Sequence, residues 1–303
     1  MTGKIKTITQ LVGLVNKIDD EPEKWWIRSL IRFDKNDNMV EDSVFLSNGT
    51  LESRNTYSYN ERNQLIEHSV FSNEEEISEK TLTHYDKDNI VKQEVIYGDG
   101  SLSIKTFTKT NNILNAIITD EEGEYEGKEI QIFNSKGQVI EECIYDENDT
   151  VQEKIIRQYD EAGHVVLRIE YGMEEEFRSK RIFEYDNNGN PVMVIDLNDA
   201  DEVIHRRSSS FDENNNVVKE NIDGYVLLYT YDDKNQRIKE EILDPYGNTE
   251  TFTEYIYDDE KRIQQSISYN SAVIRATGSS ALSSGLFPFT LSKYQYEYEE
   301  GEH

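Results

Sequence analysis

A single unit that begins with an aromatic residue recurs along almost the whole chain of 303 residues, and it constrains the fold more than any other feature. Successive copies are 26, 26, 22, 26, 26, 26, 26, 20 and 26 residues apart. A nearly constant period of this length is typical of tandem repeats that pack on their neighbours. The ten copies begin at Phe33, Tyr59, Tyr85, Phe107, Phe133, Tyr159, Tyr185, Phe211, Tyr231 and Tyr257.

The residues that follow the aromatic predict a tight turn. The next residue is Asp or Asn in nine of the ten copies, and such side chains bond the backbone of the turn that they open. The fourth residue is Asp, Asn or Gly in all but the last copy, and these types tolerate a positive φ. We therefore expect a hairpin turn with a left-handed residue at that position. The next residues are Asp34, Asn60, Asp86, Asn134, Asp160, Asp186, Asp212, Asp232 and Asp258, and the fourth residues are Asp37, Asn63, Asn89, Asn111, Gly137, Gly163, Gly189, Asn215, Asn235 and Lys261.

Each repeat continues with an apolar strand and a second polar cluster, such as Asn48-Gly49 or Asp223-Gly224. One repeat is therefore two strands and two turns, and the chain is predicted to be an all-β antiparallel meander of about ten such repeats. Positions six and seven after the aromatic are both apolar, as at Val139 and Ile140, although side chains alternate between faces along a strand. A strongly twisted or coiled sheet would account for this, and so would a bulge near each turn.

Several copies resemble a known family. The segments Tyr-Asp-x-x-Gly-x-Val at Tyr159 to Val165 and Tyr-Asp-x-x-Gly at Tyr185 to Gly189, with the 20-residue copy that begins at Phe211, are similar to the YD repeats of Rhs-type proteins. The resemblance covers the chain from about residue 33 to about residue 269 and includes no toxin domain. Most copies are longer than the usual repeat of that family. The resemblance implies a β-repeat architecture in which the Asp and Gly of the turn are structural residues.

The two ends of the chain differ from the repeats. Apolar residues between Lys4 and Asp20 recur at three- and four-residue steps, which predicts an amphipathic helix that caps the array, within an N-terminal region 1–28. The repeats occupy 29–270, and 271–303 form an uncharged loop and a final strand, expected to act as a cap, a plug or a partner-contact loop. The apolar residues at these ends are the candidate partner-binding anchors. They are Trp25, Trp26, Leu286, Phe287 and Phe289.

Composition restricts the partners and the compartment. The chain has 32 Lys and Arg against 61 Asp and Glu, a net charge of −29, which disfavours nucleic acid and anionic membranes and favours a cationic partner. Charge that keeps exposed strands soluble is the alternative explanation. The single cysteine, Cys143, excludes a disulfide framework and a cysteine-based metal site. The N-terminus lacks the pattern of a signal peptide, so a cytoplasmic protein is expected.

The sequence contains no recognisable catalytic constellation, and neither an enzyme nor a cofactor is expected. Its five histidines are dispersed, and there is no phosphate-binding glycine loop or nucleophile elbow. The spacing Asp34-Asn36-Asn38 superficially resembles a calcium loop, but Phe45 stands where the closing Glu should be, and turn formation explains the same residues. The 19 tyrosines could stack on sugars, or they could form cross-strand pairs.

Three functions are compatible with these features. The preferred hypothesis is a non-catalytic intracellular protein-binding repeat protein, specifically an immunity protein that occludes a basic toxin or effector domain. The alternatives are a carbohydrate-binding or cell-surface repeat protein, and a structural shell fragment that encloses a peptide or toxin.

Overall fold

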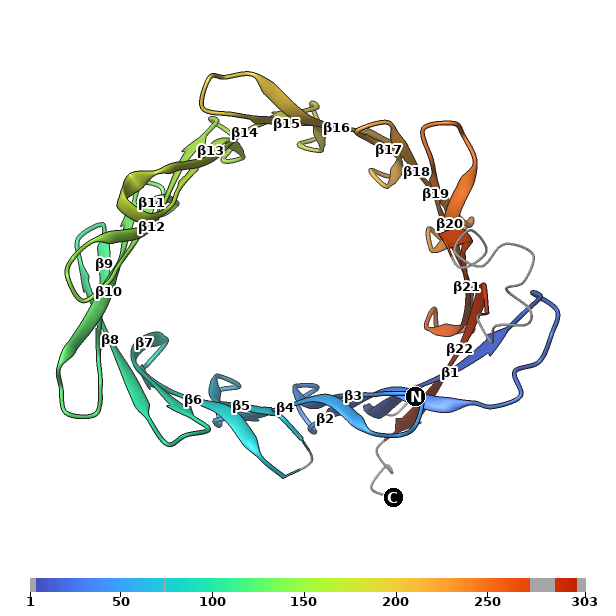
Figure 1. Cartoon of the computed structure of the whole chain (residues 1–303), viewed down its shortest axis with the longest axis horizontal. Helices are drawn as coiled ribbons and strands as arrows, with labels where there is room; N and C mark the ends of the chain where they lie inside the picture. Colours follow the sequence, from blue (N-terminus) through green and yellow to red (C-terminus); the bar gives the residue numbers. More distant parts are fainter. Residues whose placement is uncertain (1–3, 74, 273–286, 299–303) are drawn as a thin grey trace. The chain divides into compact units, whose positions relative to one another are not determined.

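The computed structural model describes residues 4–73, 75–272 and 287–298, which form 22 strands and one short 3-10 helix within those ranges. Their contacts divide the chain into two units. Unit 1 comprises residues 1–64, 70–76 and 210–303, and unit 2 comprises residues 65–69 and 77–209. The all-β antiparallel meander predicted from the repeats is confirmed, since consecutive strands pair antiparallel in each unit (Figure 1).

In unit 1 the paired strands run in the order β17 to β22, then β1 to β4, because the first strand of the chain pairs with the last. The strands are β1 (Ile5–Val15), β2 (Trp26–Phe33), β3 (Met39–Phe45), β4 (Leu51–Tyr59), β17 (Val217–Ile222), β18 (Tyr225–Tyr231), β19 (Arg237–Leu243), β20 (Thr249–Tyr257), β21 (Ile263–Asn270) and β22 (Phe289–Tyr298).

In unit 2 the paired strands run in sequence order from β6 to β16. The elements are β6 (Ile77–Asp86), β7 (Asn89–Tyr97), β8 (Leu102–Thr110), β9 (Ile113–Thr119), β10 (Tyr125–Phe133), β11 (Val139–Tyr145), β12 (Val151–Tyr159), β13 (Val165–Tyr171), η1 (Met173–Glu175), β14 (Phe177–Tyr185), β15 (Pro191–Leu197) and β16 (Val203–Phe211). Residues of β5 (Leu65–Phe71) contribute to both units, and the last two residues of β16 belong to unit 1.

The predicted N-terminal capping helix is wrong, because residues 5–15 form strand β1. β1 is paired along both edges, with β2 and with β22, so its backbone hydrogen bonds are satisfied by neighbouring strands. The segment is also rich in β-branched residues, which favour strands. The register shift beside Gln10 and Leu11 lies on β2, where Arg28 is the extra residue, and β1 itself stays in regular register with β22 at this point.

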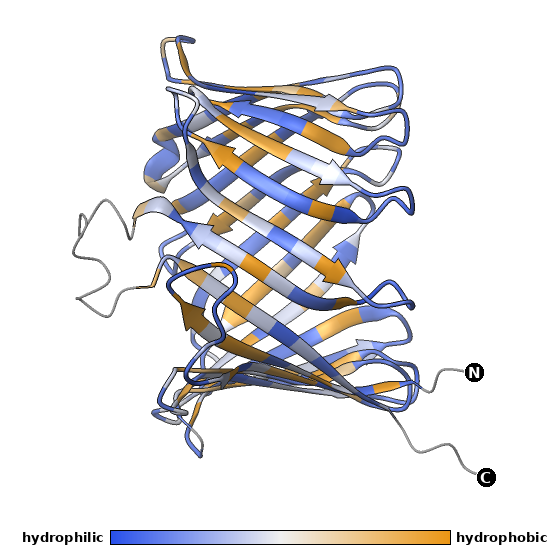
Figure 2. Ribbon diagram, turned by 90° about the vertical axis from the view of Figure 1, so that its right-hand side faces the viewer, coloured by the Kyte–Doolittle hydropathy of each residue, from blue (hydrophilic) through white to orange (hydrophobic). Residues whose placement is uncertain are grey.

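A bulge in each of several hairpins explains why two adjacent positions of the repeat are both apolar. In the hairpin of β12 and β13, Tyr159 is opposite Val165 and Gln158 is opposite Leu167, so Val166 is the extra residue. The same shift occurs at the aromatic residue in the β2–β3, β10–β11, β14–β15, β18–β19 and β20–β21 hairpins. Positions six and seven are both apolar because one is paired and the next is bulged. Apolar and polar residues accordingly mix along the strands, and the turns are mostly hydrophilic (Figure 2).

The turns after the aromatic residues have the predicted left-handed residue in nine of the ten copies, including Lys261 with φ 65°. The exception is Asn89. The turn between β6 and β7 consists of Lys87 and Asp88 alone, and the positive φ of 56° falls on Lys87.

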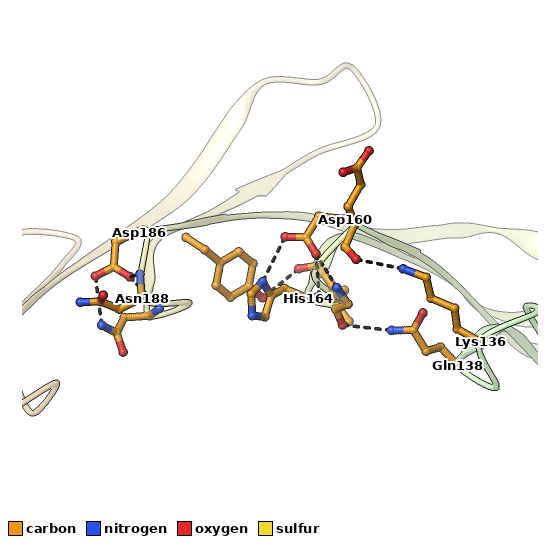
Figure 3. A network of polar contacts seen from close by, with 11 residues as sticks. Lys136, Gln138, Asp160, His164, Asp186 and Asn188 are labelled. Atoms are coloured by element: carbon orange, nitrogen blue, oxygen red, sulfur yellow. Dashed lines mark hydrogen bonds and ion pairs between the residues drawn. The ribbon is translucent and has the colours of Figure 1, made fainter.

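Eight of these ten turns are held by the side chain of their first residue. The Oδ1 atom of Asp186 accepts hydrogen bonds from the backbone nitrogens of Asn188 and Asn190, at 2.8 and 2.9 Å. The neighbouring turn adds cross-repeat contacts, because the ring of His164 lies 3.0 Å from Asp160 and stacks on Tyr185 with centroids 4.6 Å apart (Figure 3). The Asp and Asn residues of the repeat are therefore part of the turn structure.

The first and fifth residues after the aromatic are chemically matched. Where the first is Asp, as in Asp186, the fifth is a donor, and Asn190 donates to the second carboxylate oxygen at 3.0 Å. Where the first is Asn, the fifth is an acceptor, and Asn134 donates to the Oε1 of Gln138 at 2.9 Å. The same matching recurs in the pairs Asp34–Asn38, Asn60–Gln64, Asp212–Asn216 and Asp258–Arg262.

The tyrosine of each tyrosine-led copy bonds the preceding copy. Its hydroxyl donates to the carbonyl of the residue that follows the previous aromatic by six positions, as Tyr159 does to Val139 at 2.7 Å. All six tyrosine-led copies make this bond, and Tyr296 of β22 makes it to Ile263. Each of these hydroxyls thus joins its hairpin to a fixed position in the preceding one, and the bonds recur with the period of the sequence.

We predict that Tyr159→Phe lowers the free energy of unfolding by about 0.5–1.5 kcal/mol, because it leaves the half-buried carbonyl of Val139 without this donor. Four copies begin with Phe, so the variant should still fold. Urea unfolding followed by far-UV circular dichroism measures the change. Tyr246→Phe is the control, since the side chain of Tyr246 is 90% exposed. An equal loss in both variants would contradict the role of the hydroxyl.

We also predict that the turn carboxylates make the fold sensitive to acid. Hydrogen bonds from the side chain and the backbone of Asn190 hold the pKa of Asp186 below its usual value. The carboxylate therefore stabilises the fold above the unfolded-state pKa, and this contribution is lost as the pH falls through the folded-state pKa. The double variant Asp186→Asn with Asn190→Gln reproduces the matched pair of the 134–138 turn, so it should unfold at the same urea concentration as the wild type at pH 7.

Between about pH 5 and pH 3 the double variant should lose less stability than the wild type. Asp199→Asn, which removes an exposed carboxylate outside these turns, is the control for net charge. The single variant Asp186→Asn should be less stable than the double variant at pH 7, because the two amide nitrogens then face each other. A double variant as acid-sensitive as the wild type would contradict this assignment.

Candidate binding surface

The two kinds of turn in unit 2 lie at opposite ends of its strands and differ sharply in charge. Four turns that follow the aromatics, 108–112, 134–138, 160–164 and 186–190, hold three carboxylates and two lysines. At the other end, the turn at 98–101 holds a single carboxylate, Asp99. The remaining four turns at that end are 120–124, 146–150, 172–176 and 198–202, here called the acidic turns. They hold four, three, three and three carboxylates, thirteen in all, without a lysine, arginine or histidine.

A ladder of lysines reaches three of these carboxylates from the strands. Lys128 pairs with Asp149 at 2.7 Å, Lys154 with Glu175 at 2.8 Å, and Lys180 with Asp201 at 2.7 Å. The three lysines are 26 residues apart, so the ladder repeats with the period of the sequence. These pairs tie three of the four acidic turns to the adjacent hairpin and leave most of the negative charge in place.

Other carboxylates of the acidic turns have structural partners. Asp120 accepts from the backbone nitrogens of Glu122 and Glu124 at 3.0 and 2.8 Å, as the first residue of a turn does elsewhere in the chain. Asp146 accepts in the same way from Asn148 and Thr150. The first residue alone thus holds these turns, and the carboxylates that follow it are not required by the turn geometry.

Five exposed carboxylates form neither an ion pair nor a side-chain hydrogen bond within the described residues, namely Glu122, Glu124, Glu174, Glu176 and Asp199. In the four turns at the opposite end, the corresponding positions hold one glutamate, two lysines and otherwise Thr, Ser, Ala, Asn, Gln or His. Solvent-exposed charges of one sign on successive hairpins reinforce one another within a Debye length of about 10 Å at 0.1 M salt. The acidic turns therefore present a continuous anionic surface along unit 2.

Tyr125 stands beside this surface and donates its hydroxyl hydrogen bond to Asp149 at 2.7 Å. Burial raises the pKa of Tyr125 to about 12, with a further contribution from the bond to Asp149. Hydrogen bonds from Lys128 and then Tyr125 lower the pKa of Asp149. The phenol thus remains a donor and the carboxylate stays charged throughout the neutral range.

The turn at 172–176 is conformationally unusual. Glu174 and Glu175 both have positive φ, 55° and 61°, at positions where most other turns place Gly, Asn or Asp. For a residue with a Cβ this conformation costs about 1–2 kcal/mol. The turn holds Met173 outward with 57% of its surface exposed.

The sequence-predicted anchors belong to unit 1, whereas the acidic turns belong to unit 2. Trp25 is half-buried, and the ammonium of Lys293 sits 4.4 Å above its ring centroid. Trp26 begins β2 opposite Val12. The ring of Phe289 packs against Phe252 and Tyr269, at centroid distances of 6.5 and 5.2 Å.

Of the two remaining anchors, Phe287 is half-buried and Leu286 lies outside the described residues. The anchors are thus dispersed among the packing of unit 1, and their role in binding a partner stays a prediction. The repeat-turn residues occupy the structural positions described above. The acidic turns were not singled out from the sequence, although a charge count made turn by turn would have found them.

The reactive residue types have internal partners. Burial raises the pKa of the Cys143 thiol, and its sulfur lies 3.5 Å from the carboxylate of Glu141. The ring of His84 lies 2.6 Å from Glu94. Within the described ranges, no group of three His, Cys, Asp or Glu residues is placed to hold a metal ion. None of the helical segments described there has the length and apolar character that crossing a membrane requires.

Comparisons with known proteins found only distant structural similarity. No protein-family profile matches the sequence, and no curated protein matches it. A crystal structure of TcdB2-TccC3-TEV is 11% identical over 86% of this chain and 18% of that chain, with a TM-score of 0.36. A porin-like protein from Bacteroides uniformis is 12% identical over 98% of both chains, with a TM-score of 0.34. This chain therefore spans about a fifth of the TcdB2-TccC3-TEV chain, and TM-scores this low do not establish a shared fold or function.

Proposed function

We propose that this protein is a non-catalytic scaffold that binds a cationic protein through its acidic turns. The observation that carries the proposal is the asymmetry within unit 2, where thirteen carboxylates occupy four turns at one end of the strands and the matched turns at the other end are nearly neutral. A need for solubility alone would distribute charge over both ends, because both are exposed.

The acidic turns would act mainly by electrostatic steering. A surface of one sign accelerates the encounter with an oppositely charged partner and disfavours nucleic acid and anionic membranes. Five of its carboxylates form neither an ion pair nor a side-chain hydrogen bond within the described residues, so a partner's lysines or arginines would gain contacts without breaking existing ones. Repetition of the turns on successive hairpins allows several such contacts at once.

The partner that we favour is a basic toxin or effector domain, which the protein would neutralise in the cytoplasm by occluding its working surface. The resemblance of the repeat to Rhs-type YD repeats directs the proposal toward interbacterial toxin systems. Carbohydrate binding has weaker support, because the repeat tyrosines such as Tyr159 and Tyr185 are half-buried and use their hydroxyls to bond the preceding repeat.

The proposal predicts that binding depends on the position of the charge as well as on its amount. A variant with Glu122→Gln, Glu124→Gln, Glu174→Gln and Asp199→Asn should bind a Lys-Gly repeat peptide roughly tenfold more weakly at low salt, because it removes the unpaired charges of the acidic turns. Fluorescence anisotropy of a labelled peptide measures the dissociation constant.

The matched control removes four exposed carboxylates from turns that follow the aromatics, with Asp88→Asn, Glu161→Gln, Glu213→Gln and Asp233→Asn. Its net charge equals that of the first variant, and it should bind almost as the wild type does. Equal weakening in the two variants would show that the peptide responds only to net charge, and the proposal would then be abandoned.

A further inference from the structure

Directly behind the acidic turns lies a row of apolar side chains. Each acidic turn is followed by one apolar residue that begins the next strand, and these are Tyr125 of β10, Val151 of β12, Phe177 of β14 and Val203 of β16, here called the apolar row. In all four strands this residue pairs with the last residue of the preceding strand, and a bulge follows directly. The equivalent register places the four side chains on one face of the sheet.

The apolar row is partly open to solvent. Val203 is 52% exposed and Tyr125 is 37% exposed, while Val151 and Phe177 are half-buried. Met173, 57% exposed, stands in the adjoining acidic turn. Large apolar side chains at this level of exposure, next to a rim of charge, are typical of surfaces that bind another polypeptide.

The geometry of the row fits an elongated partner. Its members lie on alternate strands, about 9.6 Å apart across the sheet, which is twice the spacing of adjacent strands. Each is also offset along the strands, because Val151 is level with Lys128 and Phe177 is level with Lys154, so the row runs obliquely and its members are about 12 Å apart. Seven or eight residues of an α-helix rise about 10.5–12 Å, so apolar residues at seven- or eight-residue intervals on one helix face would meet successive members of the row. The acidic turns would then face the basic residues that flank such a helix.

We propose that the acidic turns and the apolar row together form one docking surface for a cationic amphipathic segment of the partner. This inference rests on the proposed function and specifies the partner's chemistry: basic residues for the turns and apolar residues for the row. A second copy of this chain does not fit as the occupant, because each copy has a net charge of −29 and would be repelled.

Two peptides of equal length and charge test the proposal, one repeating Lys and Leu with a helical seven-residue pattern and the other with Ser in place of Leu. The Leu peptide should bind the wild type about tenfold more tightly, because its apolar groups are buried against the row. The double variant Val203→Thr with Met173→Gln should lose most of that preference and retain its affinity for the Ser peptide.

The matched control is Val91→Thr with Ile90→Gln, which makes similar changes at exposed residues beside the turn at the other end of unit 2. Urea unfolding midpoints near the wild-type value confirm that both variants fold. Equal affinities for the two peptides, or an equal loss in the control, would overturn the docking surface and leave the proposed function standing. Failure of both peptides to bind the wild type would overturn the proposed function as well.

Discussion

The fold depends on the hydrogen bonds that one Asp or Asn side chain donates or accepts at the start of most turns. Its oxygen bonds two backbone nitrogens, as in Asp186, and its second polar atom bonds the fifth residue of the turn. The turn then places a bulge at the aromatic residue, and the bulge sets which side chains face the same way along the next strand. The tyrosine hydroxyl then donates a hydrogen bond to the preceding repeat. Because this bond recurs, neighbouring hairpins pair in the same register.

Only some positions of each turn are needed for the fold, so the others can serve a function. A turn needs a suitable first residue and a residue that tolerates positive φ, and the remaining positions can vary. In the unit 2 turns that follow the aromatics those positions hold few charges, and of both signs, whereas the acidic turns hold glutamates such as Glu122 and Glu176 that form no ion pair or side-chain hydrogen bond in the described chain. Charge that the fold does not need is the physical basis for assigning the acidic turns to a partner.

Much of the fold could be predicted from the sequence because its determinants are local. The period, the Asp or Asn after each aromatic and the left-handed residue identify two strands per repeat, and nine of the ten left-handed positions are as predicted. Asn89 is the exception, because a two-residue loop between β6 and β7 moves the positive φ to Lys87. The bulge was one of two explanations that the sequence left open.

The sequence-based predictions are wrong where the structure of a segment depends on pairing with residues that are distant in the sequence. The apolar spacing of β1 resembles that of a helix, but the segment is a strand because it pairs with both β2 and β22. No local sequence pattern reveals the pairing with β22, which lies at the other end of the chain. The candidate surface was missed for a different reason, because charge was counted over the whole chain and not turn by turn. The terminal anchors such as Trp25 were chosen for residue type alone, and the structure places Trp25 under Lys293.

The most direct test of the account is amide hydrogen exchange of the full chain, with and without the cationic Lys-Leu peptide. We predict slower exchange over the acidic turns and the first residues of β10, β12, β14 and β16, and unchanged exchange in the turns at 134–138, 160–164 and 186–190. Protection of the turns that follow the aromatics, or protection spread evenly over both ends of unit 2, would contradict it.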